Sequence, residues 1–267
     1  MKLLKVTAPY CNCLQEVWCK RVDERMKTSI GNEERLEMAQ LSATVVLVHG
    51  AWADESSWKK VRDWLDKISV KTVTVGLLMA SLKEDVTTLD MVLAAIDGPV
   101  ILVGHAYAGA VIAETQSAQV KALVYIAGLA PDEGETVVDV FNRFGHDDQA
   151  PVLEPASDGR IWLSPEAFVT AFAQYATAEE QKALATAQRP ISPACIVTPV
   201  GTPLWKRVPT WYLVAQHDHM IPEKTQRFMA DRIGAHTRAY PVDHLPSVTA
   251  PSLVADIIVD ALNVSAA

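Results

Sequence analysis

Val100-Ile101-Leu102-Val103-Gly104-His105-Ala106-Tyr107-Ala108-Gly109 is the stretch of this 267-residue chain that says most about its architecture. It begins with an apolar run typical of a strand that is buried on both faces. Small residues then form a turn, and the residues from Ala108 onward are typical of a helix. We therefore predict a buried strand, a tight turn at Ala106 and a helix in immediate succession.

The same alternation of short apolar runs and amphipathic segments extends along the chain from Thr44. Strands are expected at 44–48, 72–75, 100–103, 122–126, 210–214 and 237–240. Helices are expected at 57–68, 83–96, 108–116, 223–233 and 252–262. Strands that alternate with helices are typical of parallel sheets with crossover helices. The sequence thus predicts an α/β fold with a doubly wound, mostly parallel sheet and flanking helices.

Two segments depart from this alternation. Residues 131–205 are rich in Gly and Pro turns and contain helix-like segments at 165–174 and 178–188, which indicates an inserted helical cap. Residues 1–41 are charge-rich without a strand pattern, and we expect a loose tail there. The expected organisation is a tail at 1–41 followed by one domain at 42–267, with the cap at 131–205.

Charge and hydropathy narrow the expected partners. The net charge is −8, from 24 Lys+Arg against 32 Asp+Glu. Nucleic acid and anionic membranes are not expected, because both require a positive face. No run approaches the ~20 apolar residues that span a bilayer, and no secretory signal is recognised, so the expected location is the cytoplasm. A small-molecule substrate is the expected partner, and the oligomeric state stays open, with a homodimer as one option.

The cysteines and the short motifs do not indicate a metal or cofactor site. Cys11, Cys13 and Cys19 match no standard zinc spacing and have no histidine nearby, so free thiols are expected. Cys195 stands alone and is expected to pack in the cap or the core. The chain has neither a G-x-G-x-x-G nor a G-x-x-x-x-G-K-[ST] motif, so no nucleotide cofactor is expected.

The turn at Ala106 has the context of a nucleophile elbow, the G-x-S-x-G turn that presents a serine between a strand and a helix. Such a turn is strained and lies against neighbouring strands, so it needs small residues two before and two after its apex. Gly104 and Ala108 meet that need. Ala106 stands at the apex, where the motif has serine, and its side chain carries no oxygen.

Three further motifs stand at the ends of predicted strands. They are Val45-Val46-Leu47-Val48-His49-Gly50-Ala51-Trp52, Trp211-Tyr212-Leu213-Val214-Ala215-Gln216-His217-Asp218-His219-Met220-Ile221-Pro222 and Val242-Asp243-His244-Leu245-Pro246. With the elbow they resemble the α/β-hydrolase fold superfamily over residues 43–265. The resemblance is closest to small esterase-like members with a helical cap, with the nucleophile serine replaced by alanine.

This resemblance implies a role for several residues. Asp218 would be the triad acid and His244 the triad histidine, and they follow the elbow in the family's chain order. The backbone N–H groups of Ala51 and Tyr107 would form the oxyanion hole, which does not depend on the elbow side chain. From the residues alone, Asp218 could instead cap the following helix, and His244 could be a loop histidine.

Less specific signals surround these motifs. His105 is expected to pack beneath the elbow and to belong to the pocket. Trp52, Tyr107 and Trp162 are candidates for a pocket, although an aromatic side chain is as often part of the core.

Three explanations of Ala106 stay open. The alanine could be engineered, it could belong to an enzyme that works without serine, or the protein could only bind a small molecule. In the second case His244, held by Asp218, would act as a general base, and the oxyanion hole would stabilise the developing charge. We expect a carboxylesterase-like enzyme for a small, apolar ester or carbonyl compound, with a non-catalytic binding protein of the same fold as the alternative. An interaction module acting through the tail rests on composition only.

Overall fold

Six parallel strands form one sheet in the computed structural model, which describes residues 43–265. The strand order is β2-β1-β3-β4-β5-β6. The strands are β1 (Thr44–Val48), β2 (Lys71–Val75), β3 (Val100–His105), β4 (Val120–Ile126), β5 (Thr210–Ala215) and β6 (His236–Tyr240). The predicted doubly wound α/β fold is confirmed. The tail predicted at 1–41, with its three cysteines, lies outside the described residues.

The central strands could be recognised because they are apolar over most of their length. Every residue of β1, β3 and β5 is buried, whereas the edge strands β2 and β6 are mostly exposed or half-buried. A strand covered on both faces reads as a continuous apolar run. The chain order reverses between β1 and β3, and in open α/β sheets ligands bind at the carboxyl ends of the strands at such a point.

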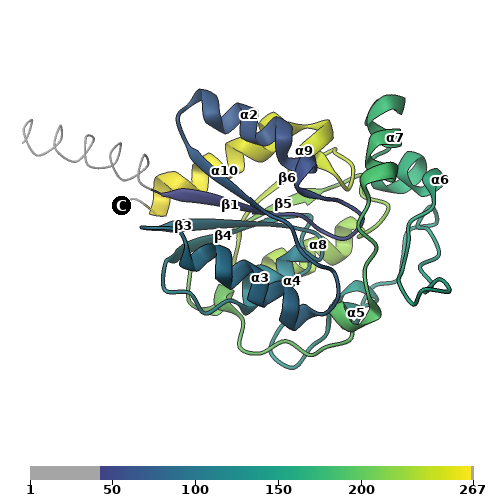
Figure 1. The fold of residues 1–267 in the computed structure, drawn as a ribbon, viewed down its shortest axis with the longest axis horizontal. Helices are drawn as coiled ribbons and strands as arrows, with labels where there is room; N and C mark the ends of the chain where they lie inside the picture. The colour runs from purple at the N-terminus through teal and green to yellow at the C-terminus, as the bar shows by residue number, and fades with distance from the viewer. Residues whose placement is uncertain (1–42, 266–267) are drawn as a thin grey trace, which may run out of the picture.

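Helices cover both faces of the sheet (Figure 1). On one face α2 (Lys59–Lys67) packs on α10 (Pro251–Ser265), and the other face is covered by α3 (Leu82–Ala94), α4 (Ala108–Glu114) and α8 (Glu223–Arg232). Side chains of a strand alternate between the two faces, so Val45 and Leu47 join one core cluster and Val46 and Val48 the other. Within residues 43–265, no helix has the length and apolar character needed to cross a membrane.

Several short helices lie between β4 and β5, and Figure 1 shows three of them, α5, α6 and α7, gathered at one end of the sheet. The elements of this insertion are α5 (Val137–Phe141), α6 (Pro165–Ala167), the π-helix η2 (Phe168–Phe172), α7 (Ala178–Ala187), η3 (Pro193–Cys195) and η4 (Leu204–Lys206). The remaining short helices are η1 (Glu55–Trp58) and α9 (Pro246–Thr249). The helix expected at 165–174 is therefore split, since α6 gives way to a π-helix.

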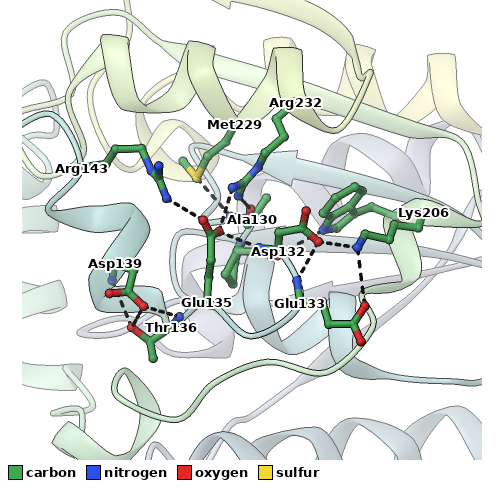
Figure 2. A network of polar contacts seen from close by, with 12 residues as sticks. Ala130, Asp132, Glu133, Glu135, Thr136, Asp139, Arg143, Lys206, Met229 and Arg232 are labelled. Carbon is green, nitrogen blue, oxygen red and sulfur yellow. Dashed lines mark hydrogen bonds and ion pairs between the residues drawn. The ribbon is translucent and has the colours of Figure 1, made fainter.

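A network of ion pairs fixes the start of the insertion to α8 and to the end of the insertion (Figure 2). Glu135 accepts from Arg143 at 2.5 Å and from Arg232 of α8 at 2.7 Å. Lys206 near the end of the insertion pairs with Asp132 at 2.5 Å. The chain therefore leaves and re-enters the sheet through one polar cluster, which holds the insertion above the strand ends.

Candidate active site

Ala106 forms a sharp turn between β3 and α4, with its backbone in the left-handed region at φ 48°. That region costs a residue with a side chain roughly 1–2 kcal/mol. Hydrogen bonds hold the turn: the Ala106 N–H donates to the Ile126 carbonyl, and its own carbonyl accepts from Gly109 at 3.0 Å and Leu129 at 2.9 Å. The surrounding structure therefore keeps a strained elbow in place.

Two glycines permit the close packing around this turn. A methyl group added at Gly104 would lie 2.9 Å from the carbonyl oxygen of Ala108. One added at Gly50 would lie 2.8 Å from the carbonyl oxygen of His105 and 3.0 Å from the Cβ of Ala106. The loop after β1 thus lies directly against the elbow, which only a residue without a side chain allows.

His49 fixes the loop after β1. Its Nδ1–H donates to the carbonyl oxygen of Gly50 at 2.9 Å, and its Nε2 accepts from the Leu77 N–H at 3.1 Å. Burial lowers the pKa of His49, so the neutral ring that these bonds require is favoured. The prediction from sequence did not assign His49 a role, although it is part of the quoted motif.

The backbone N–H groups of Ala51 and Tyr107 stand at the meeting point of this loop and the elbow. Among the described residues, neither N–H donates to a protein acceptor, and both residues line the cavity that also contains Ala106. Buried N–H groups are nearly always paired with protein or water. Two unpaired donors beside one cavity are able to bind an oxygen atom of a ligand.

His244 and Asp218 form a buried pair. The Nδ1–H of His244 donates to Oδ2 of Asp218 at 2.8 Å. The other carboxylate oxygen accepts from the N–H groups of Met220 and Ile221, each at 2.8 Å. Within residues 43–265, Nε2 of His244 has no hydrogen-bond partner, and the ring lines the cavity. Asp218 therefore fixes the tautomer and the orientation of the ring, and Nε2 is left to face a ligand.

Gln226 of α8 orients this carboxylate and was not identified from the sequence. Its Nε2 donates to Oδ2 of Asp218 at 2.9 Å and to the Ile221 carbonyl at 2.7 Å, and its Oε1 accepts from the Ala215 N–H at 2.9 Å. Gln226 is fully buried. The available signal was a polar residue on the sheet-facing side of an amphipathic helix, since buried polar groups need partners.

His105 lies beneath the elbow. Its Nε2–H donates to the carbonyl oxygen of His244 at 2.7 Å. Burial, with His244 nearby, holds the pKa of His105 well below its usual value. His105 is absent from the cavity lining and instead supports the backbone that carries His244.

Phe172 of the π-helix η2 covers the ring of His244. The two ring centroids are 5.2 Å apart, and the Phe172 ring also meets that of Trp52 edge-on at 6.3 Å. Phe172 is fully buried. The insertion therefore limits the positions that the His244 ring can adopt.

A mostly apolar cavity of about 560 Å³ contains these groups. This is the size of a small-molecule site. Its lining comprises Ala51, Trp52, Ala106, Tyr107, Leu129, Val137, Val138, Phe141, Asn142, His146, Asp147, Ala150, Pro151, Val152, Leu153, Ile161, Ile191, Ile196, Met220, Ile221 and His244.

Trp162 lies outside this lining. Its side chain is 45% exposed, and its indole N–H donates to Asp158 at 2.8 Å. Its neighbour Ile161 faces the cavity instead, and the Ile161 carbonyl accepts the indole N–H of Trp52 at 2.9 Å. The structure thus brings Trp52 and Tyr107 to the cavity. Trp162 and His105, which were also expected at the pocket, are not part of its lining, because Trp162 is held at the surface by Asp158 and His105 is bonded beneath the elbow.

The architecture and the residues at the strand ends can be compared with known proteins. The model of the Alpha/beta hydrolase family matches residues 45–257 of this chain. The chain belongs to the alpha/beta hydrolase family. Among curated relatives of this hydrolase, Methylesterase 1 of Arabidopsis thaliana is 23% identical over 243 residues, which cover 79% of this chain and 92% of the relative. Norfluorocurarine synthase 2 of Strychnos nux-vomica is also 23% identical, over 80% of this chain and 93% of its own.

Solved structures show the same fold. Polyneuridine aldehyde esterase superposes with a TM-score of 0.67 at 19% identity, over 82% of this chain and 98% of its own. The pyrethroid hydrolase PytH superposes with a TM-score of 0.69 at 20% identity, over 84% of this chain and 99% of its own. At this identity the likeness establishes the fold of this alpha/beta hydrolase.

The histidines that flank Asp218 in this hydrolase point to different partners. His217 shares a hydrogen bond with the Tyr175 hydroxyl at 2.6 Å, and His219 with Asp147 at 2.9 Å. No group of three or more His, Cys, Asp or Glu side chains suited to a metal ion occurs in the part of the chain that the structure describes.

Proposed function

We propose that this alpha/beta hydrolase is a carboxylesterase-like enzyme for a small, apolar ester or carbonyl compound. In this proposal His244 is a general base oriented by Asp218, and the N–H groups of Ala51 and Tyr107 form the oxyanion hole. Ala106 stands where enzymes of this fold carry the nucleophilic serine. The observation that carries the proposal is that Nε2 of His244, two unpaired N–H groups and Ala106 meet at one apolar cavity.

The names of the relatives support the substrate class. They include Methylesterase 1, polyneuridine aldehyde esterase and a pyrethroid hydrolase. The lining agrees, because apolar side chains such as Leu129, Val137 and Ile191 dominate it. Apolar walls with a few convergent polar groups are typical of small-molecule sites.

Without a hydroxyl at position 106, the base acts on water or on the substrate itself. In ester hydrolysis, Nε2 of His244 takes a proton from water while the water oxygen attacks the acyl carbon. The carbonyl oxygen becomes an oxyanion bound by Ala51 and Tyr107. Collapse then expels the alkoxide, which takes the proton back from His244, so an acid and an alcohol are formed. The same base and hole could instead remove a substrate proton and stabilise an enolate.

The test of this proposal restores the missing oxygen. Ala106→Ser should raise the hydrolysis of short p-nitrophenyl esters by at least about 100-fold, because losing a triad nucleophile costs up to about 10⁶ in turnover. Adding His244→Ala to Ala106→Ser should remove that gain. If Ala106→Ser folds normally but hydrolyses nothing across a broad panel of esters, the hydrolase proposal is wrong.

The alternative is a protein that binds a small apolar molecule without changing it. The methyl side chain of Ala106, which cannot attack a substrate, is the observation that favours it. That alternative requires saturable binding, recovery of an unchanged ligand and an affinity that survives His244→Ala. Loss of a measurable turnover in wild-type protein upon His244→Ala would exclude it.

A further inference from the structure

A buried carboxylate, Asp85, lies outside the site described above. It belongs to α3 and is fully buried. One of its oxygens accepts from the N–H groups of Leu78 and Met79 at 2.8 and 2.9 Å. The other accepts from the Tyr107 hydroxyl at 2.9 Å, with the Cys195 thiol at 3.8 Å. A buried carboxylate is costly unless its oxygens are satisfied, so this set of donors determines where it can sit.

The segment bound by Asp85 also holds the other half of the oxyanion hole. Leu77 donates its N–H to His49, whose ring fixes the carbonyl next to Ala51. The next two residues, Leu78 and Met79, donate to Asp85. Segment 77–79 therefore links the two halves of the hole. Leu77 binds the loop after β1 through His49, and Leu78 and Met79 are joined to the elbow through Asp85 and Tyr107.

The backbone of Met79 shows that segment 77–79 is held under strain. Its backbone is left-handed, with φ 56°, although it has a side chain and is fully buried. Strained backbone persists only where several contacts enforce it. Asp85 supplies one of these contacts, and the Ser192 N–H, which donates to the Met79 carbonyl at 2.9 Å, supplies another.

Tyr107 connects segment 77–79 to the cavity, because its side chain contacts Asp85 and its backbone lies at the cavity. Its hydroxyl is anchored on Asp85, and its backbone N–H is one of the two unpaired donors at the cavity. Burial, with the Asp85 carboxylate nearby, raises the pKa of Tyr107, so the hydroxyl keeps its proton and remains a donor. A buried aromatic side chain that is hydrogen-bonded at its tip leaves the backbone at Tyr107 little freedom to rotate.

We infer that Asp85 is a positioning residue for the oxyanion hole. Through the Tyr107 hydroxyl, Asp85 sets the direction of the Tyr107 N–H, and through residues 77–79 it sets the distance between that N–H and the N–H of Ala51. The inference rests on the proposed function in one respect, because only that function gives the two N–H groups the role of an oxyanion hole. The geometric part, that Asp85 orients the N–H at position 107, stands independently.

Four variants test this inference. Tyr107→Phe removes only the hydroxyl that reaches Asp85. Asp85→Leu removes both carboxylate oxygens that accept hydrogen bonds. Asp85→Asn keeps the shape of the side chain and its ability to form hydrogen bonds. Tyr125→Phe is the matched control, because the Tyr125 hydroxyl is buried without a partner among the described residues and lies outside the site. Tyr107→Phe carries the test, because it leaves the buried Asp85 carboxylate in place.

The first measurement needs no turnover. Residual dipolar couplings of backbone N–H groups in the ligand-free protein report the direction of each N–H bond. We expect the coupling at position 107 to change in Tyr107→Phe and Asp85→Leu, and to stay within error of wild type in Asp85→Asn and Tyr125→Phe. An unchanged coupling at position 107 in Tyr107→Phe overturns the inference.

The second measurement follows ester hydrolysis with each change added to Ala106→Ser. A misdirected N–H donor should lower kcat about tenfold, which is less than the 10²–10³-fold loss seen when a donor is removed. KM should change little, because the oxyanion hole binds the transition state more strongly than the substrate. Asp85→Asn should recover most of kcat. If Ala106→Ser alone is inactive, the proposed function fails while the couplings still decide the inference. Equal kcat in Tyr107→Phe and Tyr125→Phe counts against the inference.

Discussion

The Nε2–H of His105 donates to the carbonyl oxygen of His244 at 2.7 Å, and the two ring centroids lie 4.7 Å apart. A carbonyl can only accept, so Nε2 of His105 carries the proton and Nδ1 is bare. That Nδ1 is buried and has no partner among the described residues. His105 thus supports the backbone of His244 as a neutral ring in a place that disfavours a cation.

This arrangement predicts acid sensitivity. The folded-state pKa of His105 is below its unfolded value near 6.5, and that of His49 is lowered as well. Above pH 6.5 both rings are neutral in the folded and in the unfolded chain, so neither ring lowers the free energy of unfolding. Below it the unfolded chain binds protons that the folded one does not, so each ring costs up to about 1.4 kcal/mol per pH unit.

The measurement is urea unfolding between pH 7.5 and 5.5. We expect the free energy of unfolding of wild type to fall relative to that of His105→Gln as the pH is lowered, because the amide offers a donor to His244 but does not titrate. A constant difference between the two proteins over this range would contradict the prediction.

A second prediction concerns Gln226, which holds Asp218. Gln226→Leu leaves one donor fewer on the Asp218 carboxylate and unpaired backbone groups at Ala215 and Ile221. Each unsatisfied buried group costs about 1–3 kcal/mol, so we expect a loss of at least about 2 kcal/mol in the free energy of unfolding. The control is Gln181→Leu, since Gln181 donates a single, part-buried hydrogen bond. Comparable losses in the two variants would show that Gln226 has no special role in holding Asp218.

A third prediction concerns the contact between the loop after β1 and the elbow. Gly50→Ala places a methyl group 2.8 Å from a backbone oxygen and 3.0 Å from the Cβ of Ala106, and neither can move freely. Overpacking of this kind costs about 1–3 kcal/mol. Gly201→Ala is the control, because its nearest neighbour, a carboxylate oxygen of Glu114, lies at 3.7 Å. Thermal unfolding should separate the two, and equal midpoints would rule out the close contact.

The sheet could be predicted from the sequence because its central strands are mostly apolar and each is followed by a helix of different periodicity. The residues brought together at the strand ends follow from that topology. The partners of those residues do not. Asp85 and Gln226 lie on helices, where a polar residue usually faces solvent, and only the packed structure places them against Tyr107 and Asp218.

The insertion was the least predictable part of the site. Turn residues show where it begins, but adjacent residues such as Ile161 and Trp162 are both large and apolar, and only the backbone direction decides which faces the cavity. The π-helix η2 likewise has no sequence signature in a short helical segment. It buries Phe168 and Phe172 together, with ring centroids 5.1 Å apart. Tertiary packing therefore overrides the simple helical pattern there.

The last prediction tests whether Phe172 restrains His244. Phe172→Leu removes the ring 5.2 Å from the imidazole and leaves space in which His244 can rotate away from the cavity. Losing part of a buried aromatic ring costs less than the roughly 3–5 kcal/mol of a Phe→Ala change, so the protein should remain folded. In the Ala106→Ser background we expect kcat to fall more than tenfold, because catalytic groups must be held close to their productive geometry. Phe144→Leu is the control, since Phe144 is 39% exposed, packs on Phe228 and is not part of the cavity lining. If both variants retain the kcat of Ala106→Ser, the orientation of His244 is set by Asp218 and His105 without help from the insertion.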